Sequence, residues 1–183
     1  LTGFKWIARA PGLGFGYEEA IGFCPDPAHV RDKDGIATSV VAASLVASLK
    51  AQGRSVWDEL ERLARLHGLH VSSPLTFRVE EIEQIASGMA RLRAQPPSVL
   101  AGSPVVEVSD LSQGYRGLPP TDGVLVLTEA GDRVIARPSG TEPKLKCYLE
   151  VILPVAEGEP LPWGQARARL DAIKGAFAEI IGL

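Results

Sequence analysis

Cysteine and histidine are scarce in this sequence. Of its 183 residues, two are cysteines and three are histidines. Cys24 and Cys147 lie far apart and form no CxxC pair, which favours reduced thiols over a disulfide framework. His67 and His70 have no cysteine or carboxylate companions at metal-ligand spacing, so we interpret them as surface residues. The sequence therefore predicts no metal site within this chain.

Long apolar runs and an excess of positive charge are also missing. No apolar run reaches the roughly 18 residues of a membrane span, and no basic-then-apolar signal segment opens the chain. The net charge is −3, which does not favour a nucleic-acid or membrane partner. Reduced thiols without a signal segment indicate a cytoplasmic location. The chain opens on Leu1-Thr2-Gly3-Phe4 without an initiating methionine, so we expect a piece of a longer protein.

The first part of the chain, residues 1–70, has an α/β pattern. A Gly-rich start leads into a strand–turn–strand segment over 15–23. Asp34 is suited to be the N-cap of a helix over 35–50, which is apolar nearly all round and is expected to be buried against a sheet. A capping box from Ser55 to Asp58 predicts a second helix that stops at Gly68. The polar stretch from His70 to Thr76 is interpreted as a linker and hinge.

The second part, residues 71–183, has an α+β pattern. Near-helical apolar spacing predicts helices over 80–93 and 164–181. Strands are expected over 105–108, 124–128, 133–136 and 145–152, and the last of these alternates cleanly between apolar and polar residues. The predicted order is one helix, four strands and one helix. This part is therefore expected to be a four-stranded antiparallel sheet covered by helices.

The segment 137–144, Arg-Pro-Ser-Gly-Thr-Glu-Pro-Lys, carries the strongest chemical signal. It lies between two predicted strands, which makes it a loop at a sheet end. The planar guanidinium of Arg137 can pair with two phosphate oxygens, and a glycine lets successive N–H groups converge on an anion. The segment thus suits a phosphate monoester. A polar hairpin loop that is present for its turn geometry is the alternative.

Two further segments are rich in charge. Glu18 and Glu19 are adjacent carboxylates between glycines, and ionised carboxylates accept hydrogen bonds from vicinal sugar hydroxyls. In His29–Gly35, basic and acidic residues alternate, and Arg31 and Lys33 could face an anionic ligand. Solvated charges are the alternative interpretation of both segments.

The order of these segments resembles the phosphoglucomutase/phosphomannomutase superfamily, the α-D-phosphohexomutases. The resemblance covers nearly the whole chain and includes the segments 1–7, 18–22, 31–35 and 137–143. It implies that residues 1–70 are the last part of the family's α/β third domain. Residues 71–183 would then be the complete fourth domain, with a fold like that of the TATA-box-binding protein.

The resemblance also implies an activity and a set of site residues. Family members move phosphate between the 1- and 6-positions of glucose or mannose through a phosphoserine, a bisphosphate and Mg²⁺, with glucose 1,6-bisphosphate as the activator. The nucleophile motif Ser-His-Asn-Pro and the metal loop Asp-Gly-Asp are missing from these 183 residues. We therefore expect no catalytic residue here, no activity of this piece alone, and the remaining domains and a phosphosugar as partners. The expected substrate-binding residues are Glu18, Glu19, Lys33, Arg137, Ser139, Gly140 and Thr141, with Arg31, His29 and Lys144 as further candidates.

The choice among related activities stays open at this point. Ala20 stands where many glucose-specific relatives carry serine, and Glu-Glu-Ala-Ile-Gly looks more like the branch of phosphopentomutases and glucose-1,6-bisphosphate synthases. A phosphosugar-binding module without catalysis is the alternative from another class. Because a part-domain exposes strand edges and apolar surface, a homodimer of this piece is a further hypothesis.

Overall fold

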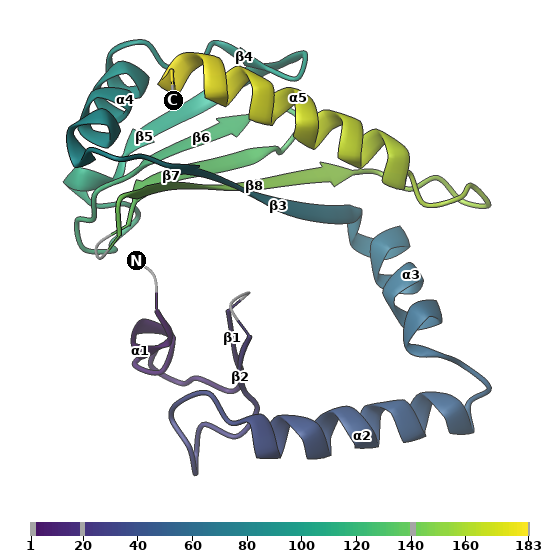
Figure 1. Ribbon diagram of the computed structural model, residues 1–183. Coiled ribbons are helices and arrows are strands. Elements are labelled where there is room, and N and C mark those ends of the chain that lie inside the picture. The colour runs from purple at the N-terminus through teal and green to yellow at the C-terminus, as the bar shows by residue number, and fades with distance from the viewer. Residues whose placement is uncertain (1–2, 19–20, 140–141, 183) are drawn as a thin grey trace. The chain divides into compact units, whose positions relative to one another are not determined.

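The computed structural model describes residues 3–18, 21–139 and 142–182 and divides the chain into two compact units (Figure 1). The division falls after Glu61, inside a helix, whereas the sequence predicts a domain boundary after residue 70. We describe each unit by itself. The first is small and mixed, and the second contains a large antiparallel sheet.

The first unit begins with a short helix and a two-stranded hairpin. Helix α1 (Phe4–Ile7) is followed by β1 (Gly16–Glu18) and β2 (Gly22–Cys24), which pair antiparallel and confirm the predicted strand–turn–strand segment. Phe4 and Cys24 are buried. Gly16 has to be a glycine here, because a Cβ would lie 2.9 Å from Ile7 Cγ2 and 3.1 Å from the Phe4 ring.

Helix α2 (Gly35–Ala51) has the predicted start but not the predicted burial. The Asp34 carboxylate accepts a hydrogen bond from the Ala37 N–H at 2.9 Å, as expected of an N-cap. Of the apolar residues along α2, only Leu49 is buried, and Ile36 is 84% exposed. The expectation of a helix buried against a sheet is therefore wrong for this chain, because the two short strands of the first unit offer no apolar face large enough to cover it.

Helix α3 (Val56–His67) begins with the predicted capping box. Ser55 N donates to Asp58 Oδ2 at 2.6 Å, and Asp58 N donates to Ser55 Oγ at 3.2 Å. These reciprocal bonds satisfy backbone donors at the helix start, and the pKa of Asp58 is lowered chiefly by the backbone bond from Ser55. Among the described residues, no single helix is long and apolar enough to span a membrane; α2 and α3 meet that criterion only together, across an 89° bend.

The second unit is a six-stranded antiparallel sheet with two helices. In spatial order the strands are β3 (Leu69–Arg78), β8 (Lys144–Leu153), β7 (Arg133–Pro138), β6 (Val124–Thr128), β5 (Ser103–Asp110) and β4 (Val99–Leu100). All pairs are antiparallel, which confirms the predicted sheet type. The sheet has two strands more than the four predicted, since β3 and β4 were not recognised.

Strand β3 replaces the hinge predicted over His70–Thr76. It pairs with β8 along its entire length, from Leu69 opposite Leu153 to Arg78 opposite Lys144. Pro74 suggested a break in the chain, but β3 lies at the sheet edge, where a proline is tolerated because the missing N–H can face away from the ladder. The hinge prediction is therefore wrong: this segment is part of the sheet.

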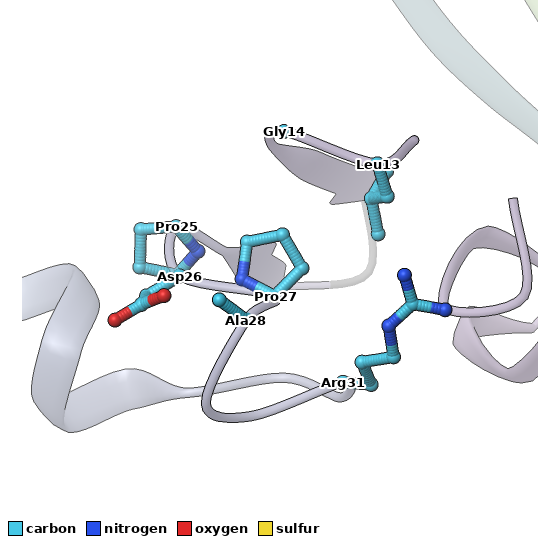
Figure 2. A pocket seen from close by; sticks show the side chains of 7 residues that line it. All are labelled: Leu13, Gly14, Pro25, Asp26, Pro27, Ala28 and Arg31. Carbon is cyan, nitrogen blue, oxygen red and sulfur yellow. The ribbon is translucent and has the colours of Figure 1, made fainter. Parts of the chain in front are cut away.

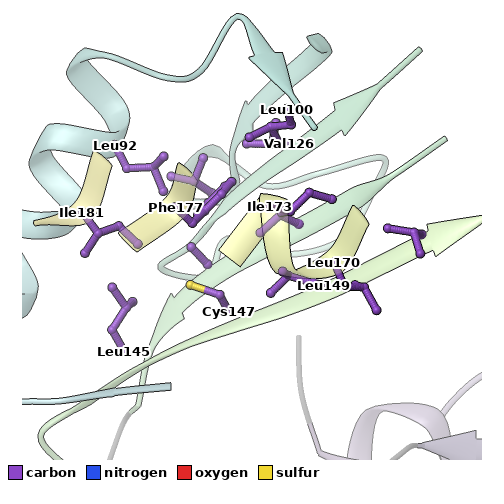
Figure 3. Close-up of a cluster of buried hydrophobic side chains, with 14 of the residues drawn as sticks. Leu92, Leu100, Val126, Leu145, Cys147, Leu149, Leu170, Ile173, Phe177 and Ile181 are labelled. Atoms are coloured by element: carbon purple, nitrogen blue, oxygen red, sulfur yellow. The ribbon is translucent and has the colours of Figure 1, made fainter. Parts of the chain in front are cut away.

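Helices α4 (Ile82–Ala94) and α5 (Trp163–Ile181) cover one face of the sheet (Figure 1). Their apolar stripes meet the inward residues of the strands, and Figure 3 shows Leu170, Ile173 and Phe177 of α5 beside Leu149 and Cys147 of β8. Burial raises the pKa of Cys147 to about 12, which makes this thiol a core residue rather than a nucleophile.

A buried ion pair fixes α5 on the turn between β6 and β7. Asp132 is fully buried, and its Oδ2 accepts bonds from Arg169 Nε at 2.9 Å and from Thr128 Oγ1 at 3.1 Å. Gly131, with φ at +86°, provides the tight turn that the sequence predicts there.

Truncating the centre of this core should unfold the second unit readily. Phe177 is fully buried, so Phe177→Ala should lower the free energy of unfolding by about 3–5 kcal/mol. Trp163, on the same helix, is 46% exposed, so Trp163→Ala should cost under about 1 kcal/mol. Urea denaturation followed by circular dichroism measures both. Equal losses would contradict the described core.

Candidate functional site

The face of the sheet opposite the helices carries the polar side chains of the second unit. Along β8 the residues alternate, with Leu145, Cys147 and Leu149 buried in the core and the residues between them on the other face. We call this second face the open face. The strand registers place on it Arg78, Thr76 and Pro74 of β3, Lys144, Lys146, Tyr148 and Glu150 of β8, Arg133, Ile135 and Arg137 of β7, Leu125 and Leu127 of β6, and Glu107 and Ser109 of β5.

The segment 137–144, which we call the clamp segment, connects β7 to β8 at one end of the open face. Ser139 N donates to Lys144 O at 2.8 Å, which continues the ladder beyond the strand ends. Pro143 O accepts from Val79 N at 3.1 Å, so the segment is also attached to the end of β3. The prediction of a loop at a sheet end is confirmed. Gly140 and Thr141 lie outside the described residues.

Cations lie directly opposite one another at the clamp end of the open face. Arg137 is the cross-strand partner of Lys146, and Lys144 is the partner of Arg78. Like charges in this position destabilise a sheet, because their side chains are neighbours on the same face. Lys144 Nζ contacts Glu142 Oε1 at 2.5 Å, and this bond is the first cause that lowers the pKa of Glu142. Four cations and one carboxylate leave this end with a positive excess.

The opposite end of the open face has balanced charges instead. Glu150 contacts Arg133 at 2.9 Å and His70 at 3.3 Å, which pairs charges across three neighbouring strands. At this end of the open face, each cation therefore has a carboxylate partner, as expected of charges that only stabilise the sheet. The clamp end instead keeps an excess of cations, which makes the electrostatic potential there positive.

Lys146 and Arg78 are site candidates that the sequence analysis missed. Their position follows from register alone: Lys146 pairs with Arg137, and Arg78 pairs with Lys144, although β3 and β8 are far apart in the sequence. The alternation of β8 was recognised, so Lys146 could have been placed on the wet face. Arg78 could not, because its segment was interpreted as the end of a linker.

In the first unit, the structure brings Glu18 and Lys33 together as an ion pair. The Glu18 side chain is mostly covered, with 18% of it exposed, while 41% of that of Lys33 is exposed. Gly22 makes this possible: a Cβ there would lie 2.5 Å from Glu18 Cγ and 3.1 Å from Lys33 Cε. Lys33 thus contacts one carboxylate oxygen of Glu18. Glu19 lies outside the described residues.

Arg31 and His29 lie apart from this pair. Arg31 borders an open hollow of about 500 Å³, and Figure 2 shows its side chain on the side opposite Pro25. A second hollow joins Arg31 to Lys5 and Arg9. His29 bonds Asp26 at 2.7 Å and is 81% exposed, which agrees with the interpretation of a solvated charge.

Metal ligands are not assembled within the described ranges 3–18, 21–139 and 142–182. No three histidine, cysteine, aspartate or glutamate side chains of these residues come close enough together to hold an ion. The donor set of the described chain therefore does not fit Mg²⁺, and we assign no chemical step to a metal on its residues.

Comparison with known proteins agrees with this geometry. Residues 75–161 match the family model described as "Phosphoglucomutase/phosphomannomutase, C-terminal domain". A Haemophilus influenzae protein named "Probable phosphomannomutase" is 43% identical over 150 residues, which cover 82% of this chain and 30% of that protein. The chain belongs to the phosphohexomutase superfamily. Its second unit contains the C-terminal domain of that family.

Other phosphohexomutase relatives align over similar lengths. A Staphylococcus aureus phosphoglucomutase is 31% identical over 84% of this chain and 31% of its own length. A mouse phosphopentomutase is 29% identical over 98% of this chain and 32% of its own length. In fold, the chain is similar to the open form of a Paramecium phosphoglucomutase, parafusin, with a TM-score of 0.65 over 98% of this chain and 33% of that one, at 18% identity. The chain thus spans about a third of the length of these relatives.

Replacing Lys146 should separate stability from anion binding. Because Lys146 faces Arg137 across the ladder, Lys146→Gln should raise the free energy of unfolding by up to about 0.5 kcal/mol. The same change should weaken the binding of inorganic phosphate about tenfold, since a charge-assisted contact is lost. Phosphate titration followed by the shift in the thermal unfolding midpoint measures both effects.

The matched control for this substitution is Lys174→Gln. Lys174 is on α5, on the covered side of the sheet, and contacts Asp171 at 3.3 Å. Phosphate affinity should not change in this variant. If the two variants bind phosphate equally well, the clamp end of the open face is not an anion site.

Proposed function

We propose that this chain is the C-terminal part of a phosphohexomutase that interconverts the 1- and 6-phosphates of glucose or mannose through a phosphoserine and a bisphosphate intermediate. The observation that supports this most strongly is the row of cations at the clamp end of the open face, formed by Arg137, Lys146, Lys144 and Arg78. Such a row stabilises a phosphate dianion and is unfavourable without one.

In this proposal the clamp segment holds the phosphate that is not reacting. Arg137 binds two phosphate oxygens through its planar fork, while Ser139, Gly140 and Thr141 donate hydroxyl and backbone N–H groups. A mutase has to accept its bisphosphate in two orientations. A site made of cations and N–H groups serves this need, because it recognises the phosphate and makes little use of the rest of the molecule.

Glu18 and Glu19 are proposed to bind the sugar hydroxyls. An ionised carboxylate accepts two hydroxyl hydrogens at once, and it discriminates by the direction from which they arrive. The ion pair with Lys33 orients the Glu18 carboxylate, and it compensates for the loss of hydration when a sugar displaces water from that carboxylate. Arg31, His29 and Lys144 are proposed as peripheral contacts.

The remaining requirements belong to the intact protein and are proposed from the family. They are Mg²⁺, activation by glucose 1,6-bisphosphate, the other domains of the chain as partners, and a cytoplasmic location. Because the motifs Ser-His-Asn-Pro and Asp-Gly-Asp are missing from these 183 residues, the chain alone is expected to bind ligand and not to turn it over. We also propose that two copies of this chain associate through the exposed apolar residues of α2.

A phosphopentomutase is the second candidate. The mouse phosphopentomutase aligns over 98% of this chain, whereas the Haemophilus protein aligns over 82%. A glucose-1,6-bisphosphate synthase and a non-catalytic phosphosugar-binding module are further alternatives. Turnover of glucose 1-phosphate, mannose 1-phosphate and ribose 1-phosphate by the intact protein distinguishes a phosphohexomutase from a phosphopentomutase, since the two prefer different substrates.

The clamp is tested by calorimetric titration of the chain with glucose 1,6-bisphosphate. Arg137→Ala removes a charge-assisted bidentate contact, so it should cost about 2 kcal/mol, or roughly thirtyfold in affinity. Arg133→Ala is the matched control, because Arg133 lies on the same strand and face but at the balanced end, beside Glu150. Equal affinity of the Arg137→Ala variant and the unchanged chain would refute the clamp assignment.

A further inference from the structure

The cations of the first unit divide into those with and those without a carboxylate partner. Lys33 contacts Glu18, and Arg54 contacts Glu59. The other cations of this unit form no ion pair with a carboxylate of the described residues; they are Lys5, Arg9, Arg31 and Lys50. The positions of these four side chains therefore decide whether the uncompensated charge is spread over the surface or gathered at one place.

Three of these four cations line one hollow of the first unit, which we call the basic hollow. It has a volume of about 490 Å³ and is lined by Lys5, Ala8, Arg9, Arg31 and Asp32. The first two cations come from α1 and the turn after it, whereas Arg31 follows β2, so separate segments bring their charges together here. Asp32 is the one carboxylate among these lining residues, and its Oδ1 accepts from the backbone N–H of Lys33 at 2.7 Å. The basic hollow thus has a net positive charge.

The two sides of the basic hollow are held together by close contacts. Phe4 of α1 is 5% exposed, and its ring atoms lie 3.1 Å from the place of a Cβ on Gly16 and 3.0 Å from that of a Cβ on Gly22. The missing Cβ atoms let the hairpin approach α1 closely. Arg31 Nη1 donates to Ala8 O at 3.4 Å, so its guanidinium reaches across to the α1 side.

Trp6 orders the two cations on the α1 side. Its ring centre lies 5.8 Å from Lys5 Nζ and 5.7 Å from Arg9 Cζ, within the range of cation–π contacts. A long side chain that already rests on an aromatic ring loses less conformational entropy when it binds a ligand. Because like charges repel one another, gathering these cations is unfavourable unless an anion lies between them.

We propose that the basic hollow is an anion site, which binds a phosphate dianion independently of the clamp segment. Arg9 and Arg31 each pair with phosphate oxygens through a planar guanidinium, and Lys5 adds a point charge. This inference goes beyond the proposed function, in which the phosphate lies on the second unit and Arg31 is only a peripheral contact.

The size and charge of the site favour a small dianion. A volume of about 490 Å³ is within the range of small-molecule sites, about 300–1,000 Å³. The chain as a whole has a net charge of −3, which disfavours a long polyanion such as a nucleic acid. Three cations attract a dianion more strongly than a monoanion, so acetate should bind about tenfold more weakly than phosphate.

The test uses Trp6 as a reporter of phosphate binding. In the 183-residue chain, Trp57→Phe and Trp163→Phe leave Trp6 as the only tryptophan, and Arg137→Ala weakens the clamp. Titration with inorganic phosphate at constant ionic strength should change the Trp6 emission in a saturable way, and calorimetry should give the same affinity. Arg9→Gln or Arg31→Gln, added to this background, should each weaken phosphate binding about tenfold.

Lys50→Gln is the matched control for net charge. Lys50 is also exposed and without an ion pair among the described residues, but 15 residues along α2 from Gly35 place it about 22 Å from the start of that helix. Phosphate affinity should not change in this variant. Arg31→Lys keeps the charge without the planar fork and should lie between Arg31→Gln and the background chain. Circular dichroism shows whether each variant keeps its helix content.

Two sources of the dianion are distinguished by a second titration. Tighter binding of glucose 1-phosphate than of inorganic phosphate would identify a sugar phosphate as the ligand, and equal affinity would identify free phosphate. Either result supports an anion site in the basic hollow, provided that Arg9→Gln weakens the binding.

The remaining outcomes separate this inference from the proposed function. If Arg137→Ala alone abolishes phosphate binding, the clamp stands and the site in the basic hollow is refuted. If Lys50→Gln weakens binding as much as Arg9→Gln, the effect is one of net charge and the inference also fails. If the background chain binds phosphate through Arg9 and Arg31 while Arg137→Ala has no effect on the affinity for glucose 1,6-bisphosphate, the basic hollow is an anion site and the clamp assignment is refuted.

Discussion

The antiparallel register between β7 and β8 is the constraint on which the candidate site depends. It places Arg137 opposite Lys146, and the register of β8 with β3 adds Arg78 opposite Lys144. A shift of one residue would move these cations to the helix side, where apolar residues fill the core. The burial of Leu145, Cys147 and Leu149 under α5 prevents that shift. Packing of the apolar residues on the helix-covered face thus determines which charged side chains lie on the open face.

The two ends of the open face show how one sheet separates stability from function. At one end Glu150 joins Arg133 and His70 into a balanced network. At the other end, the like charges of Arg137 and Lys146 stand opposite one another, as do those of Lys144 and Arg78. Each like-charge pair is unfavourable by itself, and the proposed phosphate dianion would offset this repulsion by lying between the cations. The second unit tolerates them because its core and the Asp132–Arg169 pair lie on the far side.

In the first unit, the candidate site residues are well positioned but little apolar surface is buried. Its hairpin positions Glu18 and Lys33 closely through Gly22, yet the apolar residues of α2 are exposed. A helix that is apolar nearly all round gains most of its stability from packing against other elements. The described part of the first unit provides such packing only at Leu49, while the relatives are about three times as long as this chain. Sugar recognition by this unit is therefore proposed for the intact protein.

Local sequence was sufficient for the features with short-range causes. The Asp34 N-cap, the Ser55–Asp58 capping box, the alternation of β8 and the turn at Gly131 all depend on residues within a few positions of each other, and the structure confirms them. Strand β3 was missed because its pairing with β8 outweighs the local signal of Pro74. The sequence by itself was enough to select residues 137–144 as the clamp segment and to place them between two strands. Only the tertiary structure decided that Lys146 and Arg78 share its end of the sheet, because strand pairing joins residues that are distant along the chain.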